Sequence, residues 1–212
     1  MNQISSISCI SLFWCFSSLA QNDSLGKAKI DFSVLKPKIQ FCSKNELGVF
    51  LGLGRIENNV ETVHSNKETI LELTTTNGIQ YGSFFAGIGT GVRKWGDDFL
   101  VPLFLHLSVD LSINLGKSRN AFFLCADLGN QFGSRQSNSF GNRETGNFFA
   151  AYGLGYQFPV AKQLKLYLKT TLCHQLTKAA GGYSGLGPSI YQEPYNPTYL
   201  FCRISLGLKF TK

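Results

Sequence analysis

Apolar and polar residues alternate with a period of two along most of the sequence. In a β-strand, successive side chains point to opposite faces, so this alternation places one kind of side chain on each face. Between Phe99 and Ser112 every odd-numbered residue is apolar, whereas the even-numbered residues include His106, Ser108 and Asp110. A chain that repeats such a pattern many times is restricted to an all-β fold whose strands each have one apolar face.

Seven segments carry the alternation clearly, and these are the expected strands: 46–55, 80–94, 99–112, 121–129, 147–158, 163–175 and 199–210. A weaker run at 68–75 is the expected eighth strand, because the Asn77-Gly78 pair after it favours a two-residue hairpin turn. Residues 30–35 are the alternative eighth strand. Eight consecutive strands predict an antiparallel up-and-down β-barrel with both chain ends on the same side.

The links between the expected strands fall into two groups of different length. The longer links lie together at one end of the barrel, with one short link among them: 56–67, 130–146, 176–198 and 95–98. The remaining links lie at the other end: 76–79, 113–120 and 159–162. Outer-membrane barrels have short periplasmic turns and longer extracellular loops, so we expect the longer links outside the cell.

The face opposite the apolar one is rich in small residues, and within 147–158 large and small side chains separate onto different faces. A barrel of about eight strands has an interior just wide enough for side chains, so the small residues belong inside. The leucine-rich faces then point outward, and only 16% of the residues are charged, too few for an ordinary soluble surface. We therefore expect a transmembrane barrel. A secreted soluble barrel that binds a lipophilic ligand is less favoured, because its apolar faces would have to point inward.

The N-terminal segment has the features of an export signal. Residues 4–20 carry no charge and end in Ser-Leu-Ala, a small-residue sequence of the kind that signal peptidase cleaves. The first three residues lack the usual Lys or Arg, and a short membrane anchor is the alternative. The expected organisation is a cleaved signal peptide at 1–20, an N-terminal periplasmic segment at 21–45 and the barrel at 46–212.

Several charged residues fall on the inward-facing positions of the expected strands. They are Arg93, Asp110, Asp127, Lys165, Lys169, Arg203 and Lys209. Buried charges must be paired or hydrogen-bonded, so we expect them to form a polar network that fills the barrel interior. Such a filling argues against an open pore.

A resemblance adds to this interpretation. The stretch from Asn77 to Asp110 (NGIQYGSFFAGIGTGVRKWGDDFLVPLFLHLSVD), the segment FFLCADLGNQFG and the ending LGLKF resemble the small outer-membrane β-barrel proteins of the Bacteroidetes type, which are OmpA-like and OmpX-like. The resemblance covers residues 46–212, although His106 replaces an expected Asp and two residues follow Phe210. It implies the outer membrane of a Gram-negative bacterium, contact with outer-membrane lipid and insertion by the barrel-assembly machinery. It implies no substrate.

An enzymatic alternative rests on His106 and Ser108, two residues apart on one face. Some outer-membrane barrels are lipid A deacylases, and His106-Leu107-Ser108 resembles their His-x-Ser pair. Ser-His chemistry needs a base within hydrogen-bond reach and a third group that orients it, a role open to Asp110. However, Val109 stands where the resemblance implies Asn, and the pair points into the barrel. We therefore expect no catalysis.

The long links are the remaining candidates for binding an extracellular ligand or protein. The last of them contains Tyr183, Tyr191 and Tyr195 among glycines and prolines. Loops carried on a rigid barrel are a common place for binding sites. We expect a structural role or a binding role of these loops.

The remaining composition excludes several classes of function. The net charge is +7, but the Lys and Arg residues are scattered, which does not favour nucleic-acid binding. Four cysteines follow the expected signal peptide (Cys42, Cys125, Cys173 and Cys202), without a CxxC or Cys/His spacing. We expect them to be free thiols that pack as small residues, and we expect no metal and no cofactor.

Overall fold

The structure is a computed structural model that describes residues 39–57, 60–64, 67–111, 121–136, 143–179 and 198–212. Several predicted features lie outside these residues: the signal peptide, the alternative strand at 30–35 and the tyrosines Tyr183, Tyr191 and Tyr195. None of the described segments forms a helix with the length and hydropathy needed to span a bilayer.

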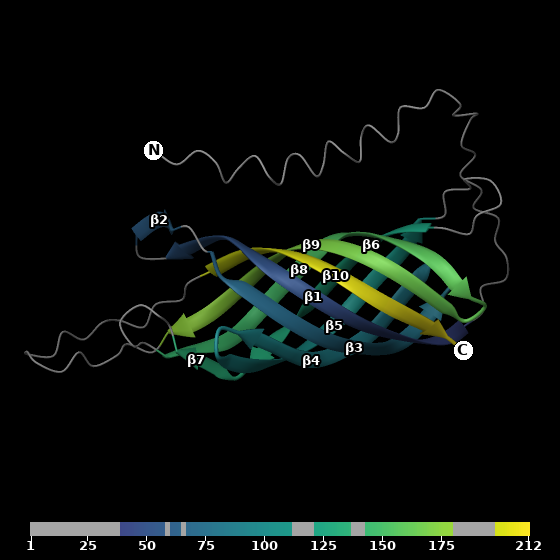
Figure 1. Cartoon of the computed structure of the whole chain (residues 1–212), viewed down its shortest axis with the longest axis horizontal. Helices are drawn as coiled ribbons and strands as arrows, with labels where there is room; N and C mark the ends of the chain where they lie inside the picture. Colours follow the sequence, from purple (N-terminus) through teal and green to yellow (C-terminus); the bar gives the residue numbers. More distant parts are fainter. Residues whose placement is uncertain (1–38, 58–59, 65–66, 112–120, 137–142, 180–197) are drawn as a thin grey trace, which may run out of the picture. The chain divides into compact units, whose positions relative to one another are not determined.

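The described residues form antiparallel strands (Figure 1). Their bounds are β1 Ile39–Glu57, β2 Val60–His64, β3 Thr69–Tyr81, β4 Phe84–Trp95, β5 Asp98–Leu111, β6 Ala121–Phe132, β7 Ser134–Gln136, β8 Arg143–Ala161, β9 Leu164–Ala179 and β10 Thr198–Thr211. Eight of them, all except the short β2 and β7, form one closed β-barrel. The prediction of an eight-stranded antiparallel barrel is confirmed.

The barrel is a meander that closes on itself. Each barrel strand pairs with the next one along the chain, and β10 pairs with β1 from Cys42↔Thr211 to Ile56↔Thr198. Closure pairs the two edge strands of the sheet, so that neither edge remains open. Because the strand number is even, β1 begins and β10 ends at the same end of the barrel.

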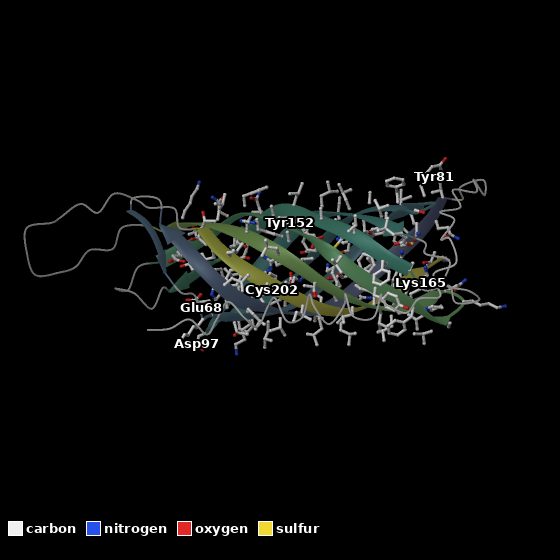
Figure 2. All side chains as sticks on the ribbon, turned by 90° about the horizontal axis from the view of Figure 1, so that it is seen from above. Glu68, Tyr81, Asp97, Tyr152, Lys165 and Cys202 are labelled. Carbon is white, nitrogen blue, oxygen red and sulfur yellow. The ribbon has the colours of Figure 1, made fainter. Side chains whose placement is uncertain are left out.

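The two ends of the barrel differ. The turn end carries the start of β1, the end of β10 and two tight turns, after Tyr81 and after Ala161. The loop end carries β2, β7 and the tight turn between Trp95 and Asp98. Figure 2 shows this separation, with Tyr81 and Lys165 near the turn end and Glu68 and Asp97 near the loop end.

The hairpin turn expected at Asn77-Gly78 is wrong. Both residues lie inside β3 and pair with Ile88 and Gly87 of β4. A Cβ atom at residue 78 would lie 2.1 Å from the carbonyl oxygen of Ala86, so glycine is needed there because the two strands approach closely. The chain turns instead at Gly82, whose φ of 60° suits glycine.

Other boundaries also differ from the expected ones: β6 ends at Phe132 rather than at 129, β8 begins at Arg143 rather than at 147, and β9 ends at Ala179 rather than at 175. Strand β1 begins at Ile39 rather than at residue 46, so that residues 39–45 belong to the barrel and not to a periplasmic segment. The turn expected at 159–162 lies after Ala161, because β8 continues to that residue. Near the start of β1 the outward-facing residues Ser43 and Asn45 are polar and interrupt the apolar alternation. For this reason the first part of the strand was not predicted.

Every barrel strand has large apolar residues on the outer surface. In β5, Phe99 is 64% exposed and Leu105 is 44% exposed, whereas Leu100 and His106 between them are buried. Large apolar residues that are 41–66% exposed occur on all eight barrel strands: Leu47, Leu73, Ile88, Leu103, Leu124, Leu154, Leu168 and Leu206. Figure 2 shows the corresponding row of carbon side chains along the outside of the barrel.

Three inward-facing glycines each lie beneath an aromatic ring of the neighbouring strand. The cross-strand pairs are Gly89 with Phe104, Gly155 with Phe123 and Gly207 with Tyr167. A Cβ atom at each glycine would lie 2.3 Å from a ring carbon. The rings therefore occupy the space that the missing side chains leave, a device known from other sheets.

We expect Gly207→Val to destabilise the barrel, because the new side chain must displace the ring of Tyr167. Tyr167 also donates a hydrogen bond of 2.8 Å to Glu46, and this bond would be lost. Overpacking of this kind costs about 1–3 kcal/mol. Urea unfolding of the protein folded in detergent micelles measures the change. The matched control is Ala86→Val on the exposed face of β4, with an expected change below about 0.5 kcal/mol.

Candidate functional site

The interior of the barrel is a packed core of charged and aromatic side chains. Five basic side chains are buried there: Lys44, Arg93, Lys169, Arg203 and Lys209. Four acidic side chains are also buried, Glu46, Glu72, Asp127 and Glu144, and Asp110 adds a fifth that is half-buried. Acidic and basic side chains therefore occur together within the described interior, as buried ions require.

Arg203 of β10 is at the centre of this core. Its guanidinium nitrogens lie 2.8 Å from Oε2 of Glu72, 2.9 Å from Oε2 of Glu46 and 3.1 Å from Oδ2 of Asp127. These carboxylates come from β3, β1 and β6. One side chain of β10 therefore contacts its neighbour β1 and also two strands, β3 and β6, with which β10 does not pair. A planar guanidinium with several donors is suited to such a contact.

Glu46 is the second point at which the network converges. Besides Arg203, it has Lys169 Nζ at 2.7 Å and accepts a hydrogen bond of 2.8 Å from the hydroxyl of Tyr167. Lys169 also lies 3.6 Å from Oδ2 of Asp127. Each of these carboxylates therefore has more than one donor, which offsets the cost of burying it.

A smaller cluster on β1, β5 and β6 surrounds His106. Its Nδ1 atom is in contact with Oδ1 of Asp127, and its Nε2 atom lies 3.0 Å from Nζ of Lys44. Lys44 donates a hydrogen bond of 2.9 Å to the hydroxyl of Ser108, and its ammonium lies 4.1 Å from the ring centre of Phe85. A cation over an aromatic face is a favourable contact.

Towards the loop end the core becomes more aromatic. Arg93 is 3.1 Å from Glu72, donates a hydrogen bond of 2.7 Å to Gln131, and lies 4.1 Å from the ring centre of Phe149. Beyond it, Trp95 packs edge-on against Tyr199 and Phe201, with ring centres 5.2 and 5.5 Å apart. Together these side chains fill the barrel between the charged centre and the loop end.

The turn end has a separate polar pair. Lys209 Nζ lies 3.4 Å from Oδ2 of Asp110, and Gln80 donates a hydrogen bond of 3.4 Å to the same oxygen. Lys165 is half-buried near this end and is opposite Lys209 in the β9–β10 register. The seven charged residues singled out in the sequence therefore do not form a single cluster. Arg93, Asp127, Lys169 and Arg203 share the central network, whereas Asp110 and Lys209 form their own pair.

Four of the ten charged side chains that the core brings together lie outside the set predicted from the sequence. Lys44 lay in the segment assigned to the periplasm, and Glu46, Glu72 and Glu144 were not recognised as inward-facing residues. For Glu46 and Glu72, the alternation of the sequence did indicate an inward-facing position. Glu46 has the parity of the inward-facing Phe50, and Glu72 has the parity of inward-facing Ile70, although each stands on a strand with few other charges.

The proposed arrangement of His106, Ser108 and Asp110 is not present in the structure. Asp110 pairs with Lys209, so Asp127 and not Asp110 is the acid in contact with His106. The Nε2 atom of His106 faces Lys44, and the same ammonium is hydrogen-bonded to Ser108. Both His106 and Ser108 are buried. Strand parity alone suggests Asp110 as the acid that orients His106, because Asp110 is two residues from Ser108 on the same face of β5.

The described residues also bear on metal binding and thiol chemistry. They include no group of three or more His, Cys, Asp or Glu side chains placed to hold a metal ion. The four cysteines are thiols and not disulfides, as predicted, and Cys42, Cys125 and Cys173 are buried. Cys202 is half-buried on the outer face of β10.

Comparisons with known proteins support the fold. No protein-family model matches the sequence, and no curated protein matches it. Among solved structures, the barrel is similar to the outer membrane protein AlkL, determined by solid-state NMR in lipid bilayers, with a TM-score of 0.50 and 12% identity over 82% of this chain and 90% of that one. It also matches Neisserial surface protein A, with a TM-score of 0.48 and 11% identity over 80% of this chain and 96% of that one. At such identities the likeness to AlkL concerns the fold alone.

Proposed function

We propose that this chain is a small integral outer-membrane β-barrel whose lumen is closed and whose role is structural or depends on binding by its loops. The observation that carries the proposal is the distribution of side chains. Large apolar residues are exposed around the whole barrel, and the charged side chains of the ion-pair network are inside. This arrangement is the reverse of a soluble barrel and suits a wall that faces lipid.

The backbone geometry also suits a bilayer. The hydrocarbon core contains no water to satisfy free backbone groups, so only helices and closed barrels can cross it. A tilted strand needs about 9–11 residues to span the core. The strands β3, β4, β5 and β10 have 13, 12, 14 and 14 residues and are long enough.

The same features support the location and contacts that the resemblance implies. We propose the outer membrane of a Gram-negative bacterium, insertion by the barrel-assembly machinery after cleavage of a signal peptide, and kinship with the Bacteroidetes-type barrels. The turn end would then face the periplasm and the loop end the outside. AlkL, which has the same fold, was studied in lipid bilayers, in agreement with such a surrounding.

The localisation is tested by fractionating cells that express the chain and running unheated and heated outer-membrane samples on a denaturing gel. We expect recovery in the outer membrane and a band that changes mobility on heating, because a closed barrel stays folded in the detergent of the gel until the sample is heated. N-terminal sequencing of the recovered protein tests the cleavage after residue 20. Recovery in a soluble fraction would contradict the proposal.

The packed core supports a closed lumen. Arg93, Arg203 and Trp95 are each buried, and each contacts a side chain of a strand with which its own strand does not pair. We therefore expect no stepwise ion conductance when the purified protein is added to a planar lipid bilayer. Steady single-channel currents at neutral pH would show that the core leaves a continuous water path.

We propose that the barrel has no catalytic role. A lipid-modifying activity that uses His106 and Ser108 is the second candidate, because the Nζ atom of Lys44 lies 2.9 Å from the Ser108 hydroxyl and a deprotonated Lys44 could accept its proton in place of His106. The burial of Ser108 argues against it, since a lipid ester would have to enter the packed lumen. Mass spectrometry of lipid A from cells that express the wild type or Ser108→Ala is expected to show the same acyl chains. Loss of acyl chains with the wild type alone would establish the enzyme.

A further inference from the structure

One area of the outer surface departs from the apolar pattern. Five polar, uncharged residues lie side by side on the outer faces of β1, β3 and β4, and we name them the outer polar patch: Ser43, Asn45, Thr75, Asn77 and Thr90. Pairing across the strands brings them together. Ser43 is opposite Asn77, Asn45 is opposite Thr75, and Thr75 is opposite Thr90. The patch is thus continuous over three neighbouring strands.

The patch lies in the middle of the wall and not at its rim. On β3, exposed Leu71 and Leu73 precede it and exposed Ile79 and Tyr81 follow it. On β1 it is bounded by exposed Phe41 and Leu47, and on β4 by exposed Ile88 and Val92. A lipid-facing wall therefore contains a polar area with apolar residues on both its periplasmic and its outer side.

Such a patch is unfavourable against lipid chains. Amide and hydroxyl groups lose hydrogen bonds to water when they face hydrocarbon, and this loss is costly without a replacement. Within the part of the chain that the structure describes, no side chain forms a hydrogen bond to these five. The partner that satisfies them must come from outside the barrel.

We propose that the outer polar patch is the contact surface of a homodimer in the membrane, in which the patch of a second copy of this chain covers it. The proposal rests on the membrane location proposed above. Each Asn side chain both donates and accepts hydrogen bonds, and so does each Ser or Thr hydroxyl. The patch is uncharged, so that two copies can meet across a twofold axis without repulsion. Hydrogen bonds between polar side chains also stabilise the association of membrane-spanning helices.

The chemistry of the patch favours a second copy over a charged partner. Residues on the patch include neither an acid nor a base that would select an opposite charge. The exposed apolar residues that surround the patch on one copy can pack against the same residues of the other copy. Elsewhere on the outer face, Thr170 of β9 lies between Leu168 and Leu172, with exposed His174 further along the strand, and β5 is apolar along its whole outward face.

The test measures association in vesicles of dimyristoylphosphatidylcholine by energy transfer between donor-labelled and acceptor-labelled protein. The label is attached at Asp97→Cys, in the exposed turn at the loop end, with Cys202→Ser to remove the half-buried thiol. The patch variant is Asn45→Leu with Thr75→Val and Asn77→Leu. We expect the wild type to associate and this variant to dissociate about tenfold more readily, since several weak hydrogen bonds are lost.

The matched control is Thr170→Val, which removes an outward hydroxyl on a different strand and should leave the energy transfer unchanged. A second measurement uses oxidative crosslinking of Thr75→Cys, which should give a disulfide-linked dimer, whereas Thr170→Cys should not. Energy transfer that is absent in the wild type, or that persists in the patch variant, would overturn the inference.

Flotation of the same vesicles separates this inference from the proposed location. Protein that floats with the vesicles but does not associate contradicts the dimer alone. Protein that does not insert into the vesicles contradicts the membrane barrel itself.

Discussion

Arg203→Met is expected to lower the free energy of unfolding by at least about 3 kcal/mol, because removal of one partner from a buried ion pair costs about 3–5 kcal/mol. Arg203 is within 3.1 Å of three carboxylates, and all three would be left with one cation fewer. Urea titration in micelles, followed by the heat-dependent gel shift, measures the loss. A fraction of the variant is expected to remain unfolded even without urea.

Two further variants show whether the loss arises from charge. Arg203→Met combined with Glu72→Gln restores the balance of charges in the core, and the new side-chain amide can still accept a hydrogen bond from Arg93. This double variant should recover part of the stability. Lys94→Met removes an exposed cation on β4 and should change the free energy of unfolding by less than about 0.5 kcal/mol. An Arg203→Met protein as stable as Lys94→Met would show that the network contributes little.

Leu105→Arg is expected to destabilise the folded barrel in lipid by about 2–4 kcal/mol, the cost of an arginine at the midplane of a bilayer on a barrel wall. Leu105 is in the middle of β5, 44% exposed, and pairs with Ile88 and Leu128, which are also exposed and apolar. A guanidinium there has no water and no carboxylate nearby on the outer face. Refolding into phosphatidylcholine vesicles at increasing urea measures the change.

The position of the arginine along β5 provides the comparison. Phe99→Arg replaces an equally outward-facing residue at the end of the same strand, where the cost falls to about 0–1 kcal/mol. A membrane wall therefore predicts a large effect at Leu105 and a small one at Phe99. Equal and small effects at both positions would indicate that water and not lipid surrounds the wall.

The outward faces of the barrel could be predicted from the sequence because they follow from parity alone. Once a strand without a bulge is recognised, the identity of one outward residue fixes all the others, whereas the irregularity between Gly146 and Phe149 of β8 reverses the parity there. The assignment of Leu105 to the outside and of His106 to the inside of β5 required no knowledge of the neighbouring strands. The meander order followed from the succession of the strands, and their even number placed both chain ends on the same side.

The position of one turn could not be predicted because the same residue type serves two purposes. Glycine after asparagine favours a hairpin turn, yet glycine also permits close approach of two strands. Gly78 serves the second purpose, and the pattern around it does not distinguish the two. The missed start of β1 has a related cause, since Ser43 and Asn45 are polar residues on an outward face.

The alternation within single strands does not predict which charged side chains pair inside the barrel. Arg203 and Glu72 are on β10 and β3, which are not neighbours because β1 lies between them. Their contact depends on the tilt and stagger of the whole barrel, which parity does not give. Parity therefore identified Asp127 as an inward residue without indicating that it, and not Asp110, would contact His106.

The joining of β10 to β1 has a consequence for the order of events during folding. The central arginine is on β10, the last of the eight barrel strands in chain order, whereas Glu46, Glu72 and Asp127 are on earlier strands. Until that strand arrives, the acids lack their shared cation and both edges of the sheet are open to other chains. Pairings between the first and last strands are also slow to form, because they join distant parts of the sequence. We expect the chain to need protection from aggregation until its final fourteen-residue strand is available, and then to close in one cooperative step.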